Sequence, residues 1–310
     1  MSLIESVAEC VLAALPYNRS DANVVNALNS KHPGELLAFY YNWRTRLISA
    51  HPRKVMRSDS FDKNPIVAQR SDVVAVIVKD IEQGNDLTKY LSRRVQTGFG
   101  LPLNPAKKKL NSLPHLDLLL NEWRIQHLHL TTTVEADGFV ERDDPLLFAM
   151  FMLGKAYLLD IGTHGTFADD QLVEIAVSNW PSDQLFLEIK GILGLRGGSP
   201  YSTEDRKQLR GAGIASFVQI GNQVFSPPGG ISTMGTSVHA MRWSNRVMRA
   251  LRDFEEYVRK DPSQIIAFVR RHGGNPSETP EFKFSIFDNG FGVIETQSGM
   301  PINLSREQTQ

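Results

Sequence analysis

The sequence predicts an α+β fold: a helical N-terminal part, a small antiparallel central sheet with flanking helices, and a C-terminal helix plus hairpins. Three patterns support this class. Apolar residues keep helical spacing over about the first 95 residues, alternate with a period of two after residue 124, and flank glycine-containing turns near the C-terminus. With 41% hydrophobic and 22% charged residues, most of the 310-residue chain is expected to fold.

The predicted domains cover residues 1–112, 113–195 and 196–310. The first is predicted to be mostly helical, because apolar residues within 7–15, 36–47 and 73–81 keep helical spacing. Pro16, Pro33 and Gly84 stand where such helices end or begin. A stretch rich in Gly, Pro, Asn and Lys precedes Pro114 and marks the first boundary.

The central domain is predicted to hold a short helix, three sequential antiparallel strands and a second helix. Ile125, His127, His129 and Thr131 alternate with Gln126, Leu128 and Leu130, as in a half-buried strand. The run LLFAMFM is apolar throughout, which is typical of an interior strand. In AYLLDIGTH the alternation returns and is expected to place Leu158, Asp160, Gly162 and His164 on one face.

The C-terminal domain follows a glycine-rich hinge at residues 196–200. Ser202 and Asp205 have the spacing of a helix N-terminal cap, and Gly221–Asn222 has the composition of a hairpin turn. A long helix is predicted from about residue 238 to 260, before a last hairpin at Asn289–Gly290.

Charge and cysteine content limit the possible partners. The formal net charge is zero, so any contact with nucleic acid must come from local basic patches. The single cysteine, Cys10, permits no intrachain disulfide and no thiolate zinc cluster. No apolar stretch approaches the roughly 20 residues that span a bilayer, and the N-terminus lacks a signal-peptide pattern. A cytoplasmic protein with no membrane partner is expected.

The candidate catalytic residues are His127, His129 and His164, with Arg124, Lys155 and Asp160 near them in the sequence. One neutral imidazole can take the 2′-hydroxyl proton of RNA while a second group protonates the leaving 5′-oxygen. Arg124 or Lys155 would supply the cation that stabilises charge on phosphorus. Strict alternation puts Arg124 opposite His127, so Arg124 serves only if the helix-to-strand junction rotates it.

The candidate substrate-binding residues are basic or hydroxylated. Arg44, Arg46 and Arg53 lie near three aromatic residues, and such interleaving can bind single-stranded nucleic acid, although a solvated helix end gives the same pattern. The remaining candidates are Lys107, Lys108, Lys109, Thr131 and Thr166, the threonines belonging to two His-x-Thr motifs.

The loop that carries Gly230, Gly235, Thr236 and Ser237 has the glycine spacing of a P-loop before a helix, but Thr236 stands in the place of its lysine. Nucleotide hydrolysis is therefore excluded for this loop. It remains either an anion-binding loop at a helix N-terminus or a plain capped loop.

Other chemistries remain open for the three imidazoles. No cofactor is required for acid–base cleavage, but His127, His129 and His164 also match a three-imidazole zinc site, with Asp160 orienting a ligand. The two His-x-Thr motifs fit a two-histidine phosphoesterase, although Gly165 stands where that pattern has an apolar residue. The imidazoles can also simply cover a polar sheet face.

The order of a helix followed by strands RIQHLHL, LLFAMFM and AYLLDIGTH, over residues 114–181, resembles the compact sheet of RelE-like bacterial endoribonuclease toxins. The resemblance covers a quarter of the chain. It implies metal-independent RNA cleavage in a toxin or phage-defence setting, with RNA and an antitoxin or other protein as partners. It would place acid–base roles on His127 or His129 with His164, and phosphate contact on Arg124 or Lys155.

The sequence thus leads to one hypothesis and two alternatives. The hypothesis is a metal-independent ribonuclease. The first alternative is a non-enzymatic interaction or regulatory protein of a defence system, in which the sheet is only a scaffold. The second is a zinc hydrolase with histidine ligands.

Overall fold

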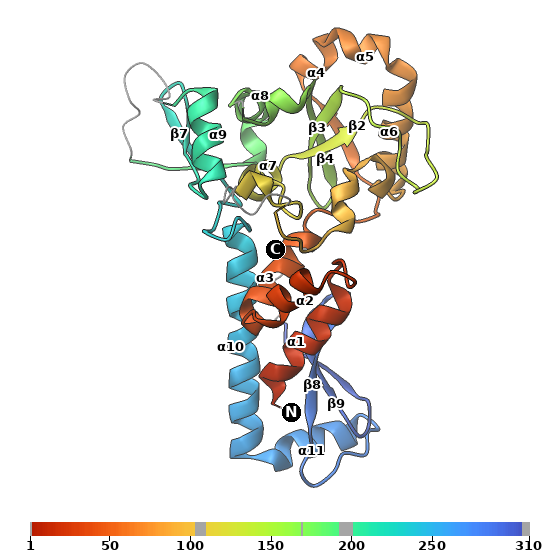
Figure 1. Ribbon diagram of the computed structural model, residues 1–310, viewed down its shortest axis with the longest axis vertical. Coiled ribbons are helices and arrows are strands. Elements are labelled where there is room, and N and C mark those ends of the chain that lie inside the picture. The colour runs from red at the N-terminus through yellow and green to blue at the C-terminus, as the bar shows by residue number, and fades with distance from the viewer. Residues whose placement is uncertain (1, 103–109, 169, 192–200, 306–310) are drawn as a thin grey trace. The chain divides into compact units, whose positions relative to one another are not determined.

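The computed structural model describes residues 2–102, 110–168, 170–191 and 201–305, and within these ranges it has the predicted mixed α+β architecture (Figure 1). Contacts divide the chain into two units. One combines residues 1–41 with 239–310, and the other contains residues 42–238. We describe each unit by itself.

The larger unit is built on a four-stranded sheet in the order β1-β4-β3-β2. The strands are β1 (Lys54–Arg57), β2 (Gln126–His129), β3 (Leu146–Phe151) and β4 (Lys155–Gly162). The antiparallel pairing of β2 with β3 and of β3 with β4 confirms the predicted central sheet. β1 was not predicted, and it pairs with β4 in parallel.

Helices cover both faces of this sheet (Figure 1). On one face lie α4 (Asp59–Lys63), α5 (Pro65–Gln69) and α6 (Ser71–Gln83); on the other lie α7 (Leu118–Trp123) and α8 (Gln171–Asn179). The alternation predicted for β2 is confirmed, because Leu128 packs in the first core and Ile125 in the second. Both cores are apolar and their strand residues are almost fully buried, which favours folding strongly.

A smaller sheet extends the second core. It has the order β5-β7-β6, formed by β5 (Leu187–Glu188), β6 (Val218–Ile220) and β7 (Gln223–Ser226). β6 and β7 form the predicted hairpin at Gly221, whose φ of 58° suits glycine. α9 (Thr203–Gly211) has the predicted cap, in which Ser202 and Asp205 bond reciprocally.

Short 3-10 turns connect the main elements of this unit. They are η1 (Thr88–Tyr90), η2 (Arg93–Gln96), η3 (Leu110–Ser112), η4 (His164–Ala168) and η5 (Pro181–Asp183).

The other unit joins the two ends of the chain. Its helices are α1 (Leu3–Ala14), α2 (Ala22–Asn29), the greater part of α3 (Pro33–Arg44), α10 (Val238–Lys260) and α11 (Pro262–Arg271). Its sheet has the order β10-β9-β8, formed by β8 (Phe282–Phe287), β9 (Gly290–Glu295) and β10 (Pro301–Asn303). α1 packs on this sheet, where the Phe284 amide donates to Ser6 Oγ at 2.8 Å.

The two units differ from the three domains predicted at residues 1–112, 113–195 and 196–310. The physical reason is non-local pairing: β1 adds an edge strand to the central sheet, and α1 packs against β8 near the other end of the chain. The predicted boundary between residues 195 and 196 lies outside the described residues. None of the described helices is both long and apolar enough to cross a membrane.

Candidate functional site

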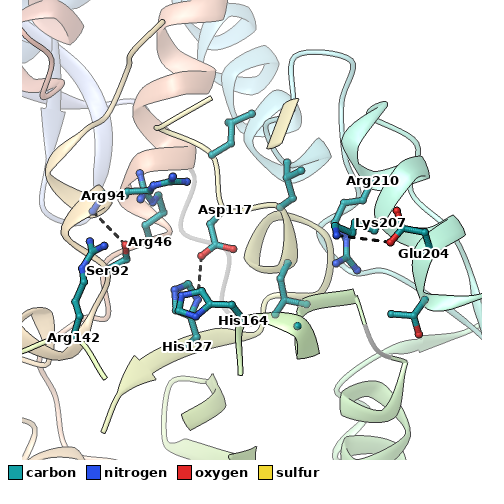
Figure 2. A pocket seen from close by; sticks show the side chains of 15 residues that line it. Arg46, Ser92, Arg94, Asp117, His127, Arg142, His164, Glu204, Lys207 and Arg210 are labelled. Atoms are coloured by element: carbon teal, nitrogen blue, oxygen red, sulfur yellow. Dashed lines mark hydrogen bonds and ion pairs between the residues drawn. The ribbon is translucent and has the colours of Figure 1, made fainter. Parts of the chain in front are cut away.

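A pocket of about 470 Å³ lies within the larger unit, where the C-terminal ends of β2 and β4 meet α7 and α9 (Figure 2). Two of the three candidate imidazoles, those of His127 and His164, line it. The pocket is rich in cations, which come from four separate segments of the chain. They are Arg46, Arg94, Arg142, Lys207 and Arg210.

The position of His127 follows from the short helix that precedes it. Asp117 caps the N-terminus of α7, where its Oδ1 accepts from the Leu120 amide at 3.1 Å. Arg124 ends the helix in the left-handed conformation, with a φ of 59°, and the chain turns back into β2. This return places His127 Nδ1 3.4 Å from Asp117 Oδ2 (Figure 2). The helix cap therefore also fixes the carboxylate that faces the imidazole.

Burial governs the charge of His127, whose side chain is 12% exposed. Desolvation lowers the pKa of His127, as do the nearby charges of His164, Arg46 and Arg94, whereas Asp117 opposes the shift. The imidazole is thus neutral at pH 7. A proton on Nδ1, the nitrogen that lies 3.4 Å from Asp117, would leave Nε2 as the basic nitrogen.

His164 differs from His127 in its surroundings. It begins η4 directly after β4, its side chain is 60% exposed, and its Nδ1 lies 3.5 Å from Asp144 Oδ1. Since its charge affects the pKa of His127, the two rings are within electrostatic range. The pocket therefore combines one buried neutral imidazole with one solvent-exposed imidazole, an arrangement suited to separate base and acid roles.

The five cations of the pocket fall into two groups, and Arg46, Lys207 and Arg210 form the group with protein partners. Lys207 lies 3.7 Å from Glu204. Arg46 is buried and donates to the carbonyls of Thr97 and His115; burial lowers its pKa to about 10, which leaves it charged at neutral pH. Arg210 is held by Glu122 at 2.5 Å. In contrast, Arg94 and Arg142 are exposed and form no ion pair with another described residue. Two charges at the pocket thus remain available to an anion.

His129 shares a sheet face with His127, as the pairing of these residues with Leu146 and Phe148 shows, but it does not line the pocket. It is 5% exposed, and burial is the main cause that lowers its pKa to about 4. Its Nδ1 has no hydrogen-bond partner among the described residues. His129 is therefore not placed to touch a ligand in the pocket.

Three predicted catalytic partners lie elsewhere. Arg124 is exposed at the end of α7 and outside the pocket. Lys155 begins β4, about 23 Å along the strand from Gly162 at a rise of about 3.3 Å per residue, and it binds Asp183 at 2.9 Å. Asp160 accepts from Asn64 Nδ2 at 2.8 Å instead of orienting an imidazole.

The predicted substrate-binding residues also divide. Arg46 lines the pocket, whereas Arg44 is exposed at the end of α3. Arg53 is buried and donates to the carbonyls of Met152 and Ser49, which gives it a structural role. Thr131 and Thr166 do not line the pocket, and their hydroxyl oxygens accept from nearby backbone amides. Lys107, Lys108 and Lys109 lie outside the described residues.

The loop with Gly230, Gly235, Thr236 and Ser237 is a capped loop and not an open anion site. Thr236 is fully buried, and the Gly230 and Gly235 amides donate to protein carbonyls. The Ser237 amide donates to Asn42 Oδ1 at 2.8 Å. These three amides are therefore already bonded and are not open to an anion.

The zinc alternative lacks a preformed ligand set. Within the part of the chain that the structure describes, no three His, Cys, Asp or Glu side chains are grouped to hold a metal ion. His129 is buried apart from the pocket that His127 and His164 share. Zinc binding by the three imidazoles stays a hypothesis, which metal analysis of the purified protein tests.

Several pocket residues were missed from the sequence. Asp117 follows Pro114 at the start of a short helix, so its position as a cap was a usable pattern. Arg94 and Arg142 stand in connecting segments without periodicity. Lys207 and Arg210 belong to a helix in a different predicted domain. Only tertiary contacts bring these four to the imidazoles.

Comparison of the chain with models of protein families, with curated proteins and with solved structures gives no match. Function is therefore inferred from the residues of the pocket.

Proposed function

We propose that the pocket cleaves RNA by metal-independent acid–base catalysis. The observation that carries the proposal is the pair of imidazoles in a cation-rich pocket, one buried beside a fixed carboxylate and one exposed. Acid–base cleavage needs two such groups with different environments, together with positive charge at the phosphate.

His127 takes the role of base in this proposal. Its Nε2 removes the proton from the ribose 2′-hydroxyl, whose oxygen attacks phosphorus and forms a 2′,3′-cyclic phosphate. Asp117 stabilises the imidazolium that results, since its carboxylate lies 3.4 Å from Nδ1. Protonated His164 donates its proton to the leaving 5′-oxygen as the P–O bond breaks. Atoms and charge balance without an additional reactant.

Arg94 and Arg142 neutralise the phosphate in this scheme. They come from different segments of the chain, Arg94 from η2 and Arg142 from the segment before β3, and both lie on the same side of the pocket (Figure 2). Charge that develops on phosphorus in the transition state is stabilised by such cations, especially where the surrounding protein excludes water. Arg46 adds a fixed positive charge from the buried side.

The wider setting rests on the resemblance to RelE-like toxins and is part of the proposal. It would make the protein a cytoplasmic ribonuclease of a bacterial toxin or phage-defence system, with an antitoxin or other protein as partner. The alternative of a non-enzymatic interaction protein predicts the same fold without turnover.

The test uses a dinucleotide with a 3′,5′ linkage, incubated with purified protein in the presence of EDTA. The proposal predicts a 2′,3′-cyclic phosphate product, and no cleavage when the 2′-hydroxyl is methylated. An unchanged dinucleotide, or cleavage that proceeds with the methylated substrate, would contradict the mechanism. Cleavage that appears only when zinc is added would favour the zinc hydrolase.

A further inference from the structure

The longest described helix, α10, carries a row of arginines on one side. Arg242, Arg246, Arg249 and Arg252 follow at intervals of four, three and three residues, and all four are exposed. At about 3.6 residues per turn these intervals keep the side chains along one side of a helix. We call these four residues the arginine face.

The arginine face lies opposite the buried side of α10. Ala240, Ser244, Val247 and Leu251 are buried and keep the same helical spacing, offset by about half a turn. In Figure 1, α1 to α3 run along one side of α10 within the same unit. The helix is thus anchored by its apolar side and presents the arginines to solvent.

On α10, carboxylates adjoin the arginine face only toward its C-terminal end, where Asp253 and Glu256 stand four residues after Arg249 and Arg252. None of its four arginines forms an ion pair with another described residue. Neighbouring arginines three and four residues apart repel one another along a helix, which disfavours this arrangement unless an anion occupies it. These two carboxylates separate the arginine face from Arg259 and Lys260 in the last turn of the helix.

We propose that the arginine face binds the sugar–phosphate backbone of single-stranded RNA. Charge complementarity carries this choice, because a polyanion can satisfy a row of cations whereas a single small anion cannot. From Arg242 to Arg252 the helix rises about 15 Å, so the row is long enough to contact several successive phosphates of one strand. The choice of RNA rests on the proposed function; the predicted backbone contact does not.

The arginine face would thus be a second RNA-contacting surface, carried by the unit that does not hold the pocket. Since the chain has no net charge, a local row of this kind is how it would hold a polyanion.

The experiment measures binding of a fluorescent single-stranded oligonucleotide with 2′-O-methyl groups, which the proposed mechanism cannot cleave. The variant is Arg242→Gln/Arg246→Gln/Arg249→Gln. Its matched control, Arg259→Gln/Lys260→Gln/Arg271→Gln, removes the same charge from exposed positions of the same unit. Circular dichroism verifies that both variants fold.

The proposal predicts that wild-type affinity falls as salt rises from about 50 to 200 mM, and that the arginine-face variant binds at least about tenfold more weakly. The slope of log K against log salt decreases in magnitude by about 2 when three phosphate contacts are lost, at about 0.7 per contact. The control keeps the wild-type slope. A variant with lysine at residues 242, 246 and 249 should regain the wild-type slope, because contact with phosphate needs positive charge.

Equal affinity and slope in the arginine-face variant would overturn the proposal, as would an equal loss in the control. Binding of the wild type to anionic phospholipid vesicles but not to the oligonucleotide would also overturn it. Dinucleotide cleavage separates the two proposals. If the dinucleotide is not cleaved while the oligonucleotide binds as predicted, the pocket chemistry fails and the arginine face stands.

Discussion

The two ends of the central sheet carry similar residues with different surroundings. At the start of β4, Lys155 binds Asp183, and Arg53 is held by backbone carbonyls. At the other end, Arg94 and Arg142 line a pocket beside two imidazoles and pair with no described carboxylate. The two ends have similar residue types, but the cations are paired with protein groups at one end and unpaired at the other. We infer that unpaired charge distinguishes a binding site from a structural cluster.

The buried ion pair beside the pocket gives the largest expected effect. Glu122 is 1% exposed and holds Arg210 of α9 at 2.5 Å, and it also accepts from the Ser216 amide. Glu122→Ala leaves a buried guanidinium without its partner and should destabilise the fold by about 3–5 kcal/mol. Urea unfolding measures this change. Asp183→Ala, at the exposed pair of the opposite end, should change stability much less, and an equal loss would contradict the distinction.

The arginines at the pocket provide the next comparison. Arg94→Ala and Arg142→Ala should each lower kcat/KM for a dinucleotide by about 10²- to 10³-fold, because each removes positive charge from the transition state. Lys155→Ala should leave kcat/KM unchanged, since Lys155 lies at the far end of β4. Initial-rate kinetics measure kcat/KM for the three variants and the wild type. A large loss in Lys155→Ala would move the site to the other end of the sheet.

A pH-dependent stability change is expected from His129. Its pKa in the fold is about 4, below the ordinary value of about 6.5, so between these limits the unfolded chain binds more protons. This contribution to stability is complete above pH 6.5 and is lost as pH falls toward 4; it amounts to on the order of 3 kcal/mol.

His129→Leu removes the titrating group. The free energy of unfolding of this variant should depend less on pH over the same range, by about one proton. Unfolding by urea at several pH values measures the slope. An unchanged slope would show that His129 does not cause the pH dependence of the free energy of unfolding. The cause would then be His115 and His127, whose pKa values are also lowered by burial.

Much of the fold followed from local patterns. The period of two in residues 125–131 located β2, and the capping pattern at Ser202 located the start of α9. β1 was not predicted, because its four residues lie in a basic segment and are extended through their pairing with β4. Such non-local pairing leaves little trace in the strand itself.

The residues that line the pocket were also predicted only in part, because non-local contacts bring them together. His127 and His164 were identified because they stand in or directly after strands, but Arg124 and Lys155 were wrongly expected beside them. The β-bulge between Phe148 and Ala149 also shifts the register of β4, so that Asp160 pairs with Phe148 and no longer shares a face with Leu158. A bulge cannot be seen in simple alternation.

The most direct test compares His127→Ala/His164→Ala with His51→Ala, which removes a half-buried imidazole that bonds to the Leu153 carbonyl near the start of β4. We predict that the double variant retains its fold and loses cleavage of the dinucleotide by at least about 10²- to 10⁴-fold. His51→Ala should cleave at the wild-type rate. A folded double variant that cleaves as fast as the wild type would contradict the assignment of the pocket as a catalytic site.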